Sequence, residues 1–235
     1  MVLAERATDE RGRQVSGTRA ILFDLDGTLI DTTGLILCCF DHSWQTVCGR
    51  IPARAGVLAT FGIPLREAML RLGADADLAE RLVTEYRQYN SANHDLLARP
   101  FTGVRQTVCE LRARGYLTGV VTSKSRELAL RGLKLCELDA LIDAAVFLED
   151  TARHKPAPEP ILAALEKLSV EASAAIYVGD SPHDMAAGRA AGVRTAAALW
   201  GSLARAELER EGPDYLLESP DELLEIFRVE EKSEV

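Results

Sequence analysis

The sequence lacks an excess of basic residues, since 27 lysines and arginines stand against 36 aspartates and glutamates and give 235 residues a formal charge of -9. Nucleic acids and anionic membranes attract basic surfaces. We therefore expect neither of them as the main partner of this protein.

Long apolar runs are also missing. No stretch of membrane-spanning length is free of charges and turn-forming residues, so no membrane anchor is expected. The N-terminal segment lacks the apolar core of a signal peptide and carries several charged residues instead: Glu5, Arg6, Asp9, Glu10, Arg11 and Arg13. These features predict a cytoplasmic protein.

The cysteines are odd in number and lack the spacing of a zinc or redox site. They are Cys38, Cys39, Cys48, Cys109 and Cys136, and we expect them to be reduced thiols. Hydrophobic residues make up 47% of the chain, which is enough for a packed interior. The sequence leaves open whether the protein is a monomer or a homodimer.

Short apolar runs alternate with amphipathic stretches over much of the chain. Such runs, joined by connections of helical length, predict a parallel sheet covered on both faces, that is, a doubly wound, Rossmann-like α/β core. The predicted strands are residues 20–23, 117–121, 144–148, 174–178 and 193–199.

One long segment after the first strand contains no strand-like run. Its apolar residues recur at helical spacing, as Phe40 and Trp44 do, so residues 32–99 are predicted to form a small helical cap inserted into the core. The core is expected to comprise residues 19–31 and 100–230, and residues 1–18 a flexible N-terminal tail.

Polar residues follow four of the predicted strands. Because the carboxyl ends of parallel strands meet at one edge of a sheet, where ligands bind, these residues are expected to line one crevice. They are Asp24, Asp26, Gly27 and Thr28 after the first strand, Thr122, Ser123 and Lys124 after the second, Lys155 beyond the third, and Asp180 and Asp184 after the fourth.

The residue types in this crevice suit a metal and a phosphate. Gathered carboxylates repel one another unless a cation neutralises them, and oxygen ligands favour a hard ion such as Mg²⁺. The metal and Lys155 could bind a phosphate, with hydrogen bonds from Thr122 or Ser123. One carboxylate could then attack phosphorus, while another protonates the leaving group and later activates water.

From Arg19 to about Phe227 the sequence resembles the haloacid dehalogenase-like superfamily of phosphotransferases. Four motifs occur in the order typical of that superfamily. They are Asp24, Asp26 and Thr28 in the pattern Asp-x-Asp-x-Thr, then Thr122, then Lys155, then Gly179, Asp180 and Asp184.

The resemblance implies a role for each of these residues. Asp24 would be the nucleophile and a metal ligand, and Asp26 the general acid and base, with its backbone carbonyl on the metal. Asp180 would be a further metal ligand, supported by Asp184 and Thr28. The residues implied to bind the substrate are Thr122, Ser123, Lys155, Gly27 and, from the cap, Arg66.

Two strings narrow the resemblance within the superfamily. Residues 85–90 and 155–160 look like those of phosphoglycolate phosphatases and of inorganic pyrophosphatases of this type. The expected substrate is a small phosphorylated metabolite: phosphoglycolate, pyrophosphate, or a sugar or nucleoside-like phosphate.

Several alternatives stay open at this point. A sugar phosphomutase or a biosynthetic tailoring phosphatase would share the core and the cap, and a receiver-like phosphorylation switch would share the chemistry. Contact of His154 or His183 with the substrate also remains open.

Overall fold

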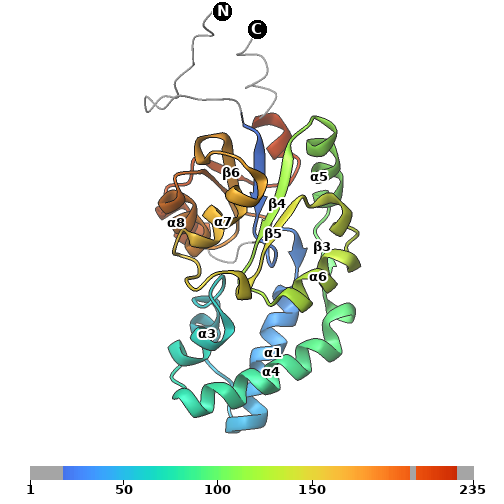
Figure 1. Ribbon diagram of the computed structural model, residues 1–235. Coiled ribbons are helices and arrows are strands. Elements are labelled where there is room, and N and C mark those ends of the chain that lie inside the picture. Colours follow the sequence, from blue (N-terminus) through green and yellow to red (C-terminus); the bar gives the residue numbers. More distant parts are fainter. Residues whose placement is uncertain (1–17, 202–204, 227–235) are drawn as a thin grey trace, which may run out of the picture.

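The computed structural model describes residues 18–201 and 205–226. Its core is a six-stranded parallel sheet in the order β5-β4-β1-β6-β7-β8 (Figure 1). The strands are β1 Ala20–Phe23, β4 Leu117–Val121, β5 Ala144–Val146, β6 Ala175–Gly179, β7 Arg194–Ala198 and β8 Tyr215–Leu217. The predicted α/β fold class is confirmed.

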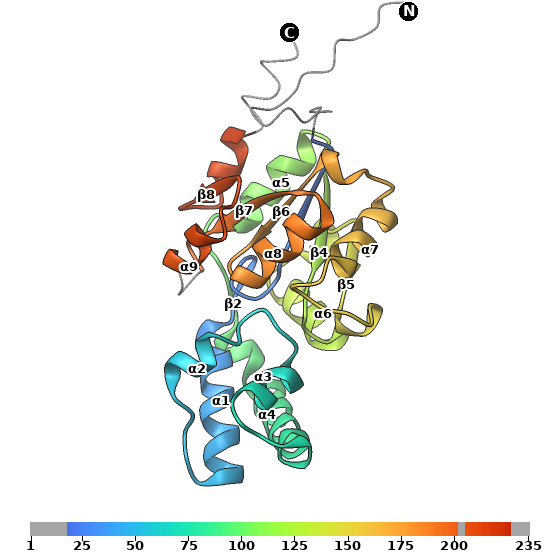
Figure 2. The same cartoon turned by 90° about the vertical axis from the view of Figure 1, so that its left-hand side faces the viewer.

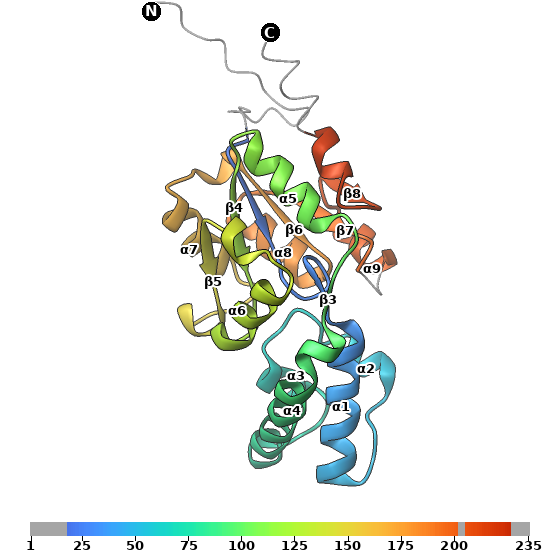
Figure 3. The same cartoon turned by 90° about the vertical axis from the view of Figure 1, so that its right-hand side faces the viewer.

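Helices cover both faces of this sheet (Figures 2 and 3). Ile21 and Phe23 of β1 pack in one hydrophobic cluster with α5 and α6, whereas Ala20 and Leu22 pack in another with α7 and α8. All four side chains are at most 2% exposed, so burial on both faces accounts for the continuous apolar run. The helices of the core are α5 Val104–Ala113, α6 Arg126–Leu135, α7 Glu159–Leu168, α8 Pro182–Ala191 and α9 Arg205–Arg210.

Two parts of the sheet differ from the predicted strands. Strand β8 is not predicted, because it is only three residues long and its first two side chains stay partly exposed at the sheet edge. The strand predicted over residues 144–148 ends early, at Val146. There the Phe147 N–H donates to Asp150 Oδ2 at 3.1 Å, and a 3-10 turn over Leu148–Asp150 takes the chain away from the sheet.

Four helices between β2 and β3 form the cap, with a hydrophobic cluster of their own. Phe40 and Tyr86 meet edge to face in this cluster at 5.3 Å, and Trp44 is fully buried. The chain enters and leaves the cap through an antiparallel pair, β2 Ile30–Asp31 and β3 Arg99–Pro100. The cap helices are α1 Thr33–Cys48, α2 Arg54–Leu58, α3 Leu65–Arg71 and α4 Ala76–Leu97.

Two of the predicted segments lie wholly or partly outside the described residues. The predicted tail lies outside the described residues except for Thr18, as do residues 227–230 of the predicted core. In the part of the chain that is described, no helix has both the length and the apolar character needed to cross a membrane. The five cysteines are free thiols.

Candidate active site

The polar residues that follow the strands meet at the edge of the sheet where the parallel strands end. Asp24 follows β1, Thr122 follows β4, Asp180 follows β6, and Lys155 lies in the loop between β5 and α7. All four line one cavity, whose opposite wall comes from α1, α3, α4 and the loop before α3 in the cap. The topology thus brings together residues that are far apart in the sequence.

Lys155 links two of the acidic residues. Its Nζ donates to Asp24 Oδ1 at 2.8 Å and to Asp184 Oδ1 at 2.6 Å. Burial alone would lower the pKa of Lys155, which is 2% exposed, but the charges of Asp184 and Asp24 raise it. The ammonium group therefore stays charged in the interior.

Tyr177 also belongs to this network, although sequence reasoning missed it. Its hydroxyl accepts from Lys155 Nζ at 3.1 Å and lies 2.9 Å from Asp184 Oδ1. Tyr177 occupies the middle of β6, where a buried aromatic residue reads only as part of an apolar strand. No sequence signal distinguishes it from an ordinary core residue.

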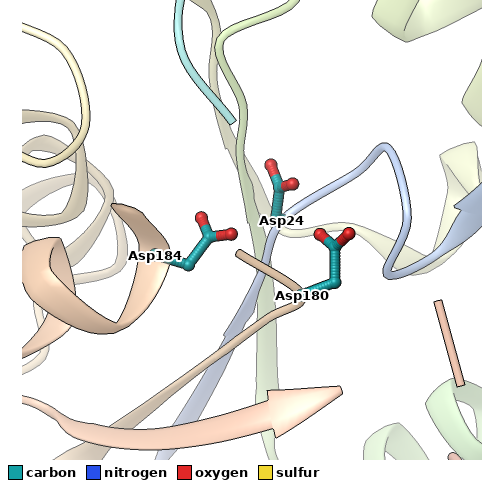
Figure 4. Close-up of side chains that lie close together, drawn as sticks. All are labelled: Asp24, Asp180 and Asp184. Atoms are coloured by element: carbon teal, nitrogen blue, oxygen red, sulfur yellow. The ribbon is translucent and has the colours of Figure 1, made fainter. Parts of the chain in front are cut away.

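Three carboxylates approach one another at and below the floor of the cavity, whose lining includes Asp24 and Asp180 but not Asp184. Asp24, Asp180 and Asp184 have oxygens within 4.8 Å of each other and point into the same space (Figure 4). Burial raises the pKa of Asp24 from 3.8 to about 7 against the opposing charge of Lys155. Burial and the charges of Asp24 and Asp184 raise the pKa of Asp180 well above its ordinary value.

Asp184 differs from the other two carboxylates because both of its oxygens have hydrogen-bond partners, whereas Asp24 and Asp180 each have a side-chain partner on Oδ1. Besides the hydrogen bond from Lys155, Asp184 accepts from Ser181 N at 3.1 Å and from Ser181 Oγ at 2.6 Å, at the N-terminus of helix α8. Burial would raise the pKa of Asp184, but the charge of Lys155 and these hydrogen bonds hold it below its ordinary value.

This contrast identifies which carboxylates fit a metal. Asp24 and Asp180 are buried, close together and incompletely neutralised, whereas Asp184 is already bound by Lys155 and Ser181. A hard divalent cation between Asp24 and Asp180 would supply the missing positive charge through oxygen ligands. The donor set therefore fits such an ion.

Asp26 faces the cap side of the cavity. Its Oδ1 accepts from Thr32 Oγ1 at 2.6 Å, just before α1, and from Lys124 Nζ at 2.7 Å. Lys124 follows the second predicted strand, but its residue type alone predicts no catalytic or binding role for it. Its position two residues after Thr122 is the signal that could have found it.

Gly27 and Thr28 shape the surroundings of Asp180. Gly27 has a φ of +84°, and a Cβ added there would lie 2.1 Å from Asp180 Oδ2, so no other residue fits without moving that carboxylate. Thr28 Oγ1 donates to Asp180 Oδ1 at 3.4 Å. Gly27 itself lines the cavity.

The two hydroxyl residues after β4 have different contacts. Thr122 Oγ1 accepts from the Lys124 N–H at 3.2 Å, within the turn that holds both residues at the cavity. Ser123 Oγ donates to the carbonyl of Gly62 in the cap at 2.9 Å. Ser123 therefore ties the core to the cap as well as lining the cavity.

The structure does not bring Arg66 to the cavity. Its Nε pairs with Glu80 Oε1 at 2.5 Å on the exposed side of the cap, and both side chains are more than half exposed. Arg87 of α4 lines the cavity instead. His154 and His183 are absent from the cavity lining, and burial lowers the pKa of His183.

The chain matches a known protein family over most of its described length. Residues 21–198 match the family model described as haloacid dehalogenase-like hydrolase. Several relatives carry the name pyrophosphatase PpaX. The chain is 43% identical to the one described for Caldanaerobacter subterraneus, over 89% of this chain and 94% of that protein. It is 40% identical to the one from Bacillus thuringiensis, over 88% and 95%.

A solved structure has a similar fold over most of the chain. A Lactobacillus plantarum protein described as a phosphoglycolate phosphatase superposes with a TM-score of 0.81 at 26% identity, covering 90% of this chain and all of that one (100%). The matched family segment contains the site residues from Asp24 to Asp184. This chain belongs to the haloacid dehalogenase-like hydrolases.

Proposed function

We propose that this protein is a Mg²⁺-dependent phosphohydrolase that releases phosphate from a small phosphorylated metabolite through an aspartyl-phosphate on Asp24. One observation carries the proposal. The Asp24 carboxylate lies at the end of β1, 4% exposed, between Lys155 and Asp180 at the floor of a cavity that Asp26 and Thr122 also line.

Asp24 and Asp180 would hold the Mg²⁺ ion, with Asp184 and Thr28 fixing their surroundings. The bound ion would supply positive charge to the phosphoryl oxygens and to the buried carboxylates. Lys155 and Thr122 would hold the remaining phosphoryl oxygens. The raised pKa values of Asp24 and Asp180 support this assignment, because both carboxylates lack sufficient positive charge without an ion.

The side chains then divide two displacement steps between them. An Asp24 oxygen attacks phosphorus, the bond from phosphorus to the leaving oxygen breaks, and Asp26 gives that oxygen its proton. Asp26 next takes a proton from water, whose oxygen attacks phosphorus and displaces Asp24. Free phosphate is released and both carboxyl groups return to their starting states.

The names of the relatives, pyrophosphatase and phosphoglycolate phosphatase, support a small leaving group. The test is a screen of phosphate release from pyrophosphate, phosphoglycolate, sugar phosphates and nucleotides at equal concentration, ranked by kcat/KM. We expect release in Mg²⁺ and none in excess chelator. Undiminished rates in chelator would refute the metal's role, and release from a monophosphate without a bisphosphate activator would exclude a phosphomutase.

A further inference from the structure

We propose that Lys124 and Arg87 form a subsite for a negatively charged group on the leaving part of the substrate. The subsite would select phosphoryl compounds whose leaving group is itself anionic, through a phosphate or a carboxylate. This inference rests on the proposed function, because it uses Asp26 to mark the side from which the leaving group departs.

Lys124 lies on that side. Its Nζ is 2.7 Å from Asp26 Oδ1, whereas the Nζ of Lys155 is 2.8 Å from Asp24 Oδ1. The Lys124 side chain is only 9% exposed. An ammonium group has three N–H donors, and among the described residues Nζ uses one, on Asp26. Donors therefore remain for a ligand beside the leaving oxygen.

Arg87 faces the same space from the cap. It lines the cavity from helix α4, and within the described parts of the chain it has no hydrogen bond or ion pair. Three other arginines of the cap are paired with carboxylates: Arg54 with Asp41, Arg66 with Glu80 and Arg71 with Glu67. Among the described residues Arg50 and Arg81 have no carboxylate partner either, but they do not line the cavity. Arg87 is thus an exposed guanidinium that lines the cavity and has no carboxylate partner among the described residues, so two of its N–H groups could hold a ligand anion.

Asn90 provides a second observation at the same wall. It lies three residues after Arg87 on α4, lines the cavity and is 2% exposed, yet its Oδ1 is buried without a hydrogen-bond partner. Buried polar atoms are rarely left without a partner in folded proteins. A ligand hydroxyl, a protonated ligand oxygen or a water between Asn90 and Lys124 would supply that partner.

The rest of the lining strengthens the attraction for an anion. Apolar side chains from the cap, among them Phe40, Phe61 and Ile63, make up much of the wall around the two cations. Charges interact more strongly where apolar groups exclude water. A neutral alcohol would gain little from Lys124 and Arg87, whereas a phosphate or carboxylate would pair with both.

Binding of phosphonates tests the subsite without catalysis. Methylenediphosphonate and phosphonoacetate carry a second anionic group, a phosphonate and a carboxylate respectively, whereas methylphosphonate carries none. By calorimetry in Mg²⁺, we expect the first two to bind at least about tenfold more tightly than the third. Arg87→Gln should remove most of this difference, and Arg87→Lys should restore part of it.

Arg81→Gln is the matched control, since Arg81 lies on the same helix and does not line the cavity. This variant should bind the three phosphonates with the same order of affinity as the wild type. In turnover, Arg87→Gln should lower kcat/KM for pyrophosphate or phosphoglycolate by about tenfold or more and for 4-nitrophenyl phosphate by much less. The comparison of pyrophosphate with phosphoglycolate shows which anion the subsite prefers.

Equal binding of the three phosphonates by the wild type would overturn the inference. An equal loss of kcat/KM in Arg87→Gln for substrates with anionic and with neutral leaving groups would also overturn it. If the wild type released phosphate from no substrate at all, the proposed function itself would fail. Equal kcat/KM values of the wild type for substrates with neutral and with anionic leaving groups would contradict the subsite but leave the proposed function intact.

Discussion

Asp24 and Asp26 lie two residues apart, yet their carboxylates have different surroundings. Asp24 is buried among Lys155, Asp180 and Asp184, whereas Asp26 is partly exposed and bonded to Thr32 and Lys124. In an extended segment both side chains point to one face, but the turn at Gly27 leaves them at different depths. The deeper carboxylate suits attack on phosphorus, and the shallower one suits proton transfer to the leaving group.

The raised pKa of Asp24 predicts how stability depends on pH. An acid that holds its proton more tightly when folded makes the free energy of unfolding fall as pH rises from its unfolded pKa to its folded pKa. For Asp24 that window runs from 3.8 to about 7, an effect of up to about 4 kcal/mol in the metal-free protein. Asp24→Asn should flatten this decline, as measured by denaturant unfolding across the window.

Mg²⁺ should counteract this fall in the free energy of unfolding. Below the raised pKa the ion must displace a proton from Asp24 before it can bind, so binding strengthens as pH rises. In scanning calorimetry Mg²⁺ should therefore raise Tm more at pH 8 than at pH 5. An equal increase at both pH values, or a decline as steep in Asp24→Asn as in the wild type, would speak against this account of the buried carboxylates.

At the scale of elements, the sequence predicts the strands that position the chemistry because they are buried on both faces. The runs at residues 20–23 and 117–121 coincide with β1 and β4. The polar residues after these two strands are recognisable for the same reason, since polar groups directly after a buried run must lie at the sheet edge. Strand β8, exposed at the margin, lacks that pattern.

The cap is harder to predict at this scale. Helical periodicity locates its helices, but several arginines lie on them, and only tertiary packing decides which one reaches the cavity. Arg66 turns to Glu80, whereas Arg87 lines the cavity. The contact between Lys124 and Asp26 likewise joins the loops that follow the neighbouring strands β4 and β1, and no short-range pattern encodes it.

The loop before α3 carries a testable contact between cap and core. Gly62 has a φ of +86°, and a Cβ there would lie 2.5 Å from Ser181 Oγ. Gly62→Ala should push this loop away from the core and weaken the hydrogen bond from Ser123 to the Gly62 carbonyl. We expect kcat/KM to fall by about tenfold, an effect of about 1.4 kcal/mol.

Gly49→Ala separates this effect from backbone strain. Gly49 also belongs to the cap and has a φ of +69°, but nothing lies within 4 Å of an added Cβ. Both variants should lose about 1 kcal/mol of stability to the left-handed conformation, and only Gly62→Ala should lose activity. Equal kcat/KM values for the two variants would show that the loop contact has no part in turnover.

At the scale of the whole molecule, three hydrophobic clusters of the described residues hold the sheet and its helices, and a fourth holds the cap. The chain crosses between these parts through the short β2 and β3 pair. The residues proposed for phosphoryl transfer lie at strand ends of the core, whereas Arg87 and Asn90 lie on the cap. We infer that the core determines the reaction and that both parts together determine the leaving group.

The central claim is that Asp24 becomes phosphorylated during turnover. Asp26→Asn should make this species accumulate with 4-nitrophenyl phosphate, because that leaving group needs little acid assistance while the second step lacks its base. Borohydride reduction of the quenched protein converts an aspartyl-phosphate to homoserine, which peptide mass spectrometry locates. We predict homoserine at position 24 in Asp26→Asn and none once Asp24→Asn is added. The double variant Asp26→Asn with Asp31→Asn is the control, because Asp31 is an aspartate outside the cavity lining, and it should also give homoserine at position 24. Release of nitrophenol without homoserine at position 24 would contradict the account.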